Sequence, residues 1–174
     1  MQNEINEGLA LFRKNCGIEH NEGNLLANIN DELTEILRTK TGLELIGELC
    51  DVYIFARNGL HQNNMQVDII HDWAIGYTGK KAVIDSYIEI SKSIAECYFE
   101  DKKNTLNRLC SIVCWFICGI GYEPEKCIIE TIKKINSRKG AIDESINKWV
   151  KDRSQDPLTL YEPDYDKCKV KQSL

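Results

Sequence analysis

Two pairs of acidic residues with helical spacing are the part of this sequence best suited to chemistry. Glu32 and Glu35 are three residues apart, and Glu48 and Asp51 repeat that spacing a short interval later. Residues three or four apart share a helix face, so each pair would present two carboxylates side by side. Four carboxylates packed together repel one another unless a cation lies between them. Mg²⁺ prefers about six oxygen ligands and shares them with water and phosphates, which suits such a site.

The elements that must position these acids are two consecutive helices, expected at about 24–39 and 41–58. Thr41 and Glu44 have the spacing of a capping box, which marks the start of the second helix. The short connection between the two helices favours antiparallel neighbours, which would bring the two acidic pairs together. The alternative is that all four are ordinary surface acids. Spacing alone slightly favours that alternative, because glutamate is common on exposed helix faces.

Helical periodicity continues along most of the chain and predicts an all-α helical bundle. Its length of 174 residues suits one domain or a fused pair of small helical units. Further helices are expected at about 3–15, 67–75, 81–100, 104–118 and 123–135. After Asn136 the pattern is lost, so residues 140–174 are expected to form an irregular tail. A short helix is expected there at about 144–150, and no segment gives a convincing strand signal.

Composition excludes several classes of function. The net charge of −5 argues against nucleic-acid binding through a general basic surface. The longest apolar run, Leu109–Ile120, is too short to span a bilayer and is expected to be a buried core helix. Because Met1–Gly8 is polar and carries two glutamates, no signal peptide is expected, and the chain is predicted to be cytoplasmic.

The eight cysteines are predicted to be reduced and mostly buried. No CxxC motif occurs, and the histidines lack zinc-ligand spacing relative to the cysteines. A di-iron carboxylate bundle is also disfavoured, because such sites use Glu-x-x-His pairs and the sequence has none.

The acidic segment Glu32-Leu33-Thr34-Glu35, followed by Glu48-Leu49-Cys50-Asp51, resembles the ExxE…ExxD signature of the all-α nucleoside triphosphate pyrophosphatases. That superfamily includes MazG-like proteins and dimeric dUTPases. A second block looks like the end of phage and bacterial MazG-like enzymes. It comprises Gly121-Tyr122-Glu123-Pro124, Asn136-Ser137-Arg138, the stretch Lys148–Asp152, and Tyr161, Asp164, Tyr165 and Cys168. The resemblance covers roughly residues 24–60 and 109–168.

The resemblance implies hydrolysis of a nucleoside or deoxynucleoside triphosphate to the monophosphate and pyrophosphate. It implies that Glu32, Glu35, Glu48 and Asp51 bind Mg²⁺, for which Mn²⁺ could substitute. Glu35, and next Glu32, are the candidates for activating water. Candidate substrate contacts are Asn136, Arg138, Lys133, Lys148, Lys151 and Trp149. For the basic residues among them, the alternative interpretation is that they belong to a solvated helix end, since positive charge is favourable near a helix C-terminus. The resemblance also implies a homo-oligomer, either dimer or tetramer, in a bacterium or a phage-infected cell.

The chain departs from the short members of that family between its two matching blocks. A weak repeat at an offset of sixty aligns 47–52 with 107–112 and 59–60 with 119–120, although the identities are few enough for chance. If the repeat is real, the second half is degenerate and has lost the metal site. The positions sixty residues after the four acids hold Lys92, Ala95, Arg108 and Ser111.

The expected organisation is therefore a pyrophosphatase domain at 1–139 and a tail at 140–174 that packs on the active site or on a partner subunit. Within the domain, 24–60 forms the metal-binding helix pair and 80–138 the second half. The alternative function is a non-catalytic helical module that binds nucleotides or proteins and retains the fold.

Overall fold

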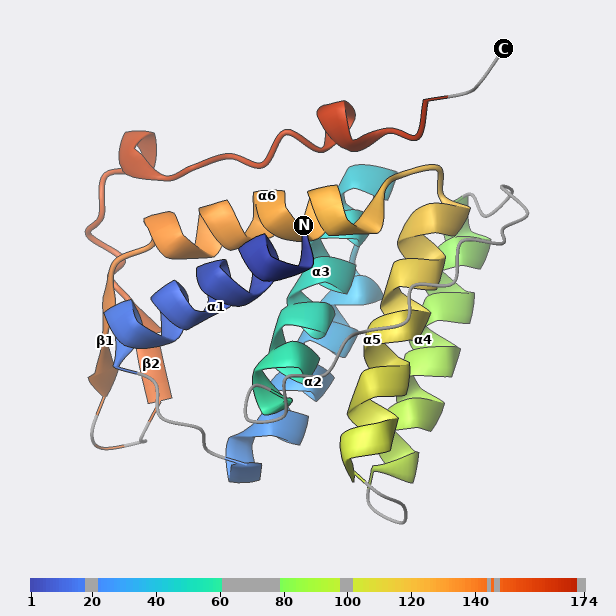
Figure 1. Cartoon of the computed structure of the whole chain (residues 1–174), viewed down its shortest axis with the longest axis horizontal. Coiled ribbons are helices and arrows are strands. Elements are labelled where there is room, and N and C mark those ends of the chain that lie inside the picture. The colour runs from blue at the N-terminus through green and yellow to red at the C-terminus, as the bar shows by residue number, and fades with distance from the viewer. Residues whose placement is uncertain (18–21, 61–78, 98–101, 144, 146–147, 172–174) are drawn as a thin grey trace.

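The computed structural model describes residues 1–17, 22–60, 79–97, 102–143, 145 and 148–171. These residues form a mostly helical bundle with a small two-stranded hairpin near the C-terminus (Figure 1). The elements in chain order are α1 (Gln2–Cys16), α2 (Glu22–Ile36), α3 (Gly42–Gly59), α4 (Gly79–Glu96), α5 (Lys102–Gly119), α6 (Pro124–Ser137), β1 (Gly140–Asp143), β2 (Lys148–Lys151), η2 (Pro157–Thr159) and η3 (Tyr165–Cys168).

Helix α3 is the centre of the bundle. It packs against α2, α5 and α6, while α4 covers α5 and α1 crosses α6 (Figure 1). A helix surrounded by others must be apolar on most of its circumference. The sequence of α3 meets that requirement with a buried set that comprises Leu45, Ile46, Leu49, Cys50, Val52, Tyr53, Ile54 and Ala56.

The all-helical prediction is confirmed for the bundle, and the six helices expected in the described residues are present with boundaries shifted by a few residues. The capping box at Thr41 and Glu44 is present, and Pro124 occupies the first turn of α6 as expected. The expected short helix at 67–75 and the loop at 61–64 lie outside the described residues.

The prediction of an irregular tail with a short helix at about 144–150 and no strands is wrong for the hairpin. Residues 148–150, expected to end that helix, belong to β2, which pairs antiparallel with β1, so that Ala141 faces Val150 and Ile142 faces Trp149. Aromatic and β-branched side chains favour strands, and Trp149 also packs edge-on against Phe12 of α1, with 6.1 Å between ring centroids. Four residues are too few for an alternating pattern to be recognised in the sequence.

All eight cysteines are free, and seven of them are buried, as the sequence predicted. Cys110, Cys114 and Cys118 lie along the buried face of α5, which is the core helix expected from the apolar run. Within the described part of the chain, no helix combines the length and apolar character needed to cross a membrane.

Candidate metal centre

Helices α2 and α3 bring three of the four predicted acids together. Glu32 of α2 and Glu48 and Asp51 of α3 each offer a carboxylate oxygen, and these oxygens all lie within 4.8 Å of one another. The capping box fixes where α3 begins, because the Thr41 hydroxyl accepts from the Glu44 amide at 3.1 Å and the Glu44 carboxylate accepts from the Thr41 amide at 3.3 Å. Glu48, Asp51 and Glu32 are named below as the acid cluster.

The acid cluster lies where water is partly excluded, and this changes its protonation. Burial, followed by the negative charges of Asp51 and Glu48, raises the pKa of Glu32 to about 8. The pKa of Glu48 is raised by burial and then by Asp51. Burial also raises the pKa of Asp51, although nearby basic groups oppose the shift. Ionising all three carboxyl groups therefore costs free energy, because they are partly buried and repel one another. A bound cation would offset this cost.

Three basic side chains lie near enough to these carboxylates for their charges to act on them. Lys134 at the end of α6, Arg138 just after it and Lys151 in β2 each favour the charged form of Asp51, which lowers its pKa. The pKa of Lys151 is lowered by loss of hydration and by Arg138, which shows that the cations also crowd one another. Among the described residues, none of the three forms an ion pair with the acid cluster. The site thus places positive groups near negative ones without pairing them directly.

The acid cluster has the ligand type and the grouping that one hard divalent cation could use. Its three carboxylate oxygens lie within 4.8 Å of one another, and oxygens at opposite corners of an octahedral Mg²⁺ site lie about 4.2 Å apart. The carboxylates would therefore have to move closer together to bind Mg²⁺. Mg²⁺ usually takes one or two protein carboxylates and fills its other positions with water and phosphate oxygens.

The remaining predicted residues are less closely grouped. The Glu35 carboxylate is about half exposed and pairs with Arg38 at 2.8 Å, although its charge still acts on Glu32 and Glu48. Lys133 pairs with Glu130 at 2.7 Å instead of facing the acids.

Two other candidate substrate contacts lie where α1 meets the C-terminal elements. The Asn136 amide donates to the carbonyls of Gly8 and Ile132. Trp149 packs on Phe12 of α1. The side chain of Lys148 lies outside the described set, although its backbone belongs to β2.

Lys134 is the basic residue that the sequence reading missed. It lies in the last turn of α6, just before Arg138, and the charges of both residues favour the charged form of Asp51. The neighbouring Lys133 faces away, although nothing in the sequence separates the two lysines. The resemblance directed attention to Lys133, Arg138, Lys148 and Lys151 and passed over Lys134.

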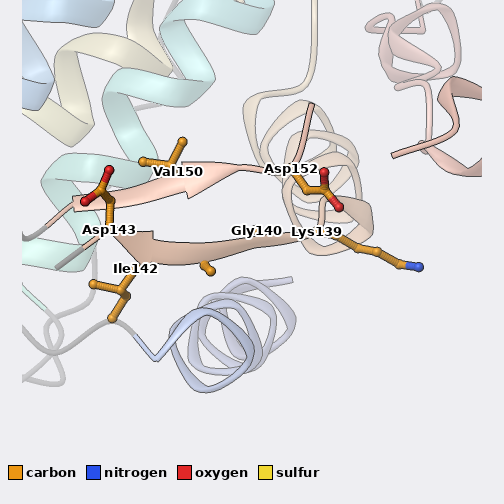
Figure 2. Close-up of a pocket in the computed structure, with 7 residues that line it drawn as sticks. Lys139, Gly140, Ile142, Asp143, Val150 and Asp152 are labelled. Carbon is orange, nitrogen blue, oxygen red and sulfur yellow. The ribbon is translucent and has the colours of Figure 1, made fainter. Parts of the chain in front are cut away.

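A separate hollow of about 420 Å³ lies at the hairpin (Figure 2). Its lining comprises Lys139, Gly140, Ala141, Ile142, Asp143, Val150 and Asp152. All of these residues are exposed, and none belongs to the acid cluster. The hollow is therefore a feature of the outer surface and does not extend the candidate metal centre.

Comparison of the chain with protein-family models, with curated proteins and with solved structures finds no match. The site itself consists of three carboxylates from α2 and α3, with three basic side chains nearby, two at the end of α6 and one in β2.

Proposed function

We propose that this chain is a Mg²⁺-dependent pyrophosphatase that hydrolyses a nucleoside or deoxynucleoside triphosphate to the monophosphate and pyrophosphate. The observation that carries the proposal is the acid cluster facing Lys134, Arg138 and Lys151. Carboxylates that hold a divalent cation and basic side chains that bind phosphate oxygens are what recognition of a triphosphate requires. The ExxE…ExxD resemblance supplies the choice of reaction.

The roles of the chain's residues follow from their positions. Glu32, Glu48 and Asp51 would hold Mg²⁺, which when bound neutralises phosphate charge and lowers the pKa of a coordinated water. Arg138 can bind a phosphate through two parallel hydrogen bonds, whereas a lysine acts as a point charge.

The attacking water would need a carboxylate to orient it or accept its proton. Glu35 is the first candidate because it lies on the same helix as Glu32 but outside the closely grouped ligand set. Glu32 is the second candidate. Attack at the α-phosphorus would break the bond between the α- and β-phosphates and release pyrophosphate. Breaking the bond between the β- and γ-phosphates would release orthophosphate instead.

The helix boundaries support the finer interpretation of the fold as a MazG-like arrangement with a duplicated hairpin. Helix α3 (Gly42–Gly59) and helix α5 (Lys102–Gly119) have equal lengths, and both boundaries of α5 lie sixty residues after those of α3. The C-terminal ends of α2 and α4, Ile36 and Glu96, have the same offset.

In the second helix pair the positions equivalent to the acids have reversed or lost their charge. Lys92, which corresponds to Glu32, pairs with Glu89 at 2.6 Å, and Arg108, which corresponds to Glu48, pairs with Glu96. This half would pack against α3 without binding metal. The homo-oligomer expected from the resemblance stays a prediction.

The decisive experiment incubates the protein with each common ribo- and deoxyribonucleoside triphosphate and Mg²⁺, and separates monophosphate, pyrophosphate and orthophosphate. Pyrophosphate release that is lost in Glu48→Gln and Asp51→Asn would support the proposal. Glu89→Gln, on the exposed surface of α4, is a matched control that should retain activity. Release of orthophosphate would contradict the reaction. Cation binding without turnover of any triphosphate would favour the non-catalytic nucleotide-binding alternative.

A further inference from the structure

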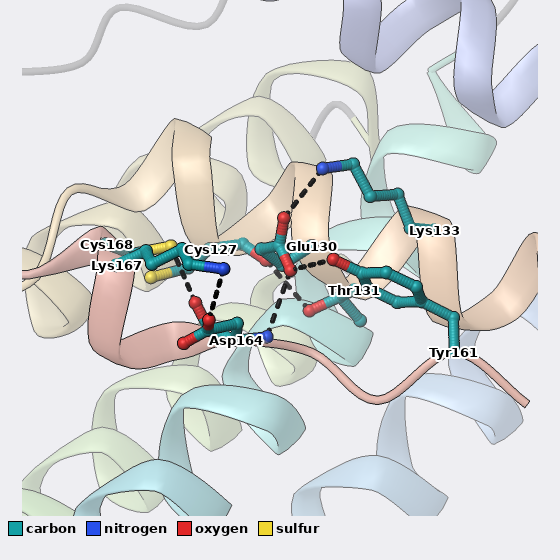
Figure 3. Close-up of polar contacts among 8 residues, drawn as sticks. All are labelled: Cys127, Glu130, Thr131, Lys133, Tyr161, Asp164, Lys167 and Cys168. Carbon is teal, nitrogen blue, oxygen red and sulfur yellow. Dashed lines mark hydrogen bonds and ion pairs between the residues drawn. The ribbon is translucent and has the colours of Figure 1, made fainter.

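The C-terminal segment from Asp156 to Lys171 runs back along α6 and is hydrogen-bonded to it at several levels (Figures 1 and 3). Near the end of α6, the Tyr161 amide donates to the Ser137 hydroxyl at 2.9 Å. Halfway along, Glu130 accepts from the Tyr161 hydroxyl and, at 3.0 Å, from the Asp164 amide.

Before the start of α6, two backbone contacts hold the other end of the segment. The Glu123 amide donates to the Cys168 carbonyl at 2.7 Å, and the Val170 amide donates to the Gly121 carbonyl at 3.0 Å. The segment is thus anchored along the whole helix and not at one point.

Tyr165 is the residue of this segment that reaches past α6 to α3. Its side chain is 8% exposed, and its hydroxyl lies 2.8 Å from the Thr131 hydroxyl of α6. The same hydroxyl lies 3.6 Å from where a Cβ atom would stand on Gly47 of α3. Gly47 immediately precedes Glu48. The phenol therefore lies between the two helices, next to the acid cluster.

The hydroxyl of Thr131 joins α6 to the tail at this point. It donates to the Cys127 carbonyl at 3.0 Å, and it lies 2.8 Å from the Tyr165 hydroxyl, so the two hydroxyls share one hydrogen bond. Cys50 of α3 is fully buried in the same core cluster as Tyr165, and it lies between Glu48 and Asp51 in the sequence. The bond between α6 and the tail is therefore buried in the same core as the part of α3 that carries the acids.

Thr131 also lies on the part of α6 that leads to the basic side chains. Lys134 is three residues further on in the same helix, and Arg138 is the first residue after the helix ends. Holding Thr131 in place therefore holds this end of α6, with its two cations, near Glu48 and Asp51.

We propose that Tyr165 is a positioning residue for the candidate metal centre, holding α3 and α6 at the separation at which the acid cluster and the basic side chains act together. This inference rests on the proposed function, because it assigns Tyr165 a role at that same site. Tyr165 is not one of the acids that would bind the cation, so it acts through its hydrogen bond to Thr131 and its position beside Gly47.

The test compares Tyr165→Phe with Tyr161→Phe, using Mn²⁺ alone as the probe and electron paramagnetic resonance to measure free Mn²⁺. Both variants remove one tail hydroxyl that bonds to α6, but only the Tyr165 hydroxyl lies beside Gly47 of α3. We expect Tyr165→Phe to weaken Mn²⁺ binding by about tenfold, the lower end of what loss of a hydrogen-bonding partner just outside a metal site costs. Tyr161→Phe should bind Mn²⁺ like the wild type. Measurements well below the unfolding temperature of each variant separate this effect from lost stability.

Thr131→Val supplies a second, nearly isosteric variant that removes the same hydrogen bond from the other side. If the two residues act through one bond, the double variant should lose no more affinity than either single variant. If Tyr165→Phe binds Mn²⁺ as tightly as the wild type does, while Glu48→Gln no longer binds it, the positioning role of Tyr165 is overturned. The proposed function is not affected by that result. Absence of Mn²⁺ binding by the wild type would overturn both this inference and the proposed function.

Discussion

A carboxylate oxygen of Glu48 on α3 lies within 4.8 Å of a carboxylate oxygen of Glu32 on α2. Two carboxylates this close repel each other, so a proton on one of them is favoured when no cation is present. Burial and the charges of Asp51 and Glu48 accordingly raise the pKa of Glu32 to about 8. Protons and divalent cations are alternative ways of neutralising the same cluster, and several measurable consequences follow from this competition.

Without divalent cations, the protein should lose stability as the pH rises. The folded state raises the pKa of Glu32 from 4.5 to about 8, so between these values the folded state holds a proton that the unfolded state has released. Stability is then present below about pH 4.5 and is lost as the pH rises through about 8. Thermal unfolding in a chelator from pH 5 to 9 measures this loss. Glu32→Gln should flatten the dependence, and an equal slope in wild type and variant would contradict the assignment.

Affinity for Mg²⁺ should increase over the same pH range. A carboxylate must lose its proton before it binds a metal, so binding releases protons wherever Glu32 is still protonated. Calorimetric titrations with Mg²⁺ at pH 7, in buffers of different ionisation enthalpy, would report the number of protons released. We expect net release at pH 7 and almost none at pH 9. Affinity that does not change between pH 6 and 9 would show that the cation binds elsewhere.

Lys134 and Lys133 offer a matched pair on one helix. Lys134 acts on Glu48 and Asp51, whereas Lys133 pairs with Glu130. Lys134→Ala should weaken binding of a triphosphate in the presence of Mg²⁺ by about tenfold, as expected when an interaction of roughly 1.4 kcal/mol is lost. Lys133→Ala should bind the triphosphate normally. Isothermal titration with a non-hydrolysable triphosphate analogue measures both, and equal losses would exclude a specific role for Lys134.

The helical core could be predicted from sequence because its signal is periodic. Leu45, Leu49 and Val52 recur at helical spacing along α3, and Thr41 marks its start. Convergence of Glu48 with Glu32 was predictable for a related reason, since a short connection forces neighbouring helices to pack side by side.

The contributions of the C-terminal segment could not be predicted in the same way. Lys151 reaches the acids only because a four-residue strand folds back on β1, and Tyr165 reaches α3 only because the tail retraces α6. Contacts between residues so far apart in sequence leave no local pattern. Irregular segments are defined by such tertiary contacts, and for that reason their role at the site emerged only from the structure.

The capping box of α3 should contribute measurably to stability. Thr41→Ala removes the hydroxyl that accepts from the Glu44 amide, which should cost about 1 kcal/mol. For a chain of this size that corresponds to a decrease of about 2–4 °C in Tm. Thr34→Ala is the control, because Thr34 is exposed on α2 and its hydroxyl bonds back to the Asn30 carbonyl of the same helix. A Tm for Thr41→Ala equal to that of the control would contradict a stabilising role for the cap.

Gly140 should be required to place Lys151, because the two residues face each other across the hairpin. A Cβ atom on Gly140 would collide with the Trp149 ring and with the Val150 carbonyl, and a backbone carbonyl cannot move aside as a flexible side chain can. Gly140→Ala should therefore displace β2, lower the free energy of unfolding by about 1–3 kcal/mol, and weaken triphosphate binding. Mn²⁺ binding should survive, since none of the three carboxylates lies on the hairpin.

Gly42→Ala is the matched control for this substitution, because no atom lies within 4 Å of the added Cβ and the residue is helical. Alanine should leave triphosphate binding unchanged there and raise stability slightly, since it has less backbone freedom to lose on folding. Circular dichroism, thermal unfolding and titrations with Mn²⁺ and a triphosphate analogue would separate these effects. If Gly140→Ala loses stability but binds the triphosphate as tightly as Gly42→Ala does, then Lys151 does not contact the phosphates.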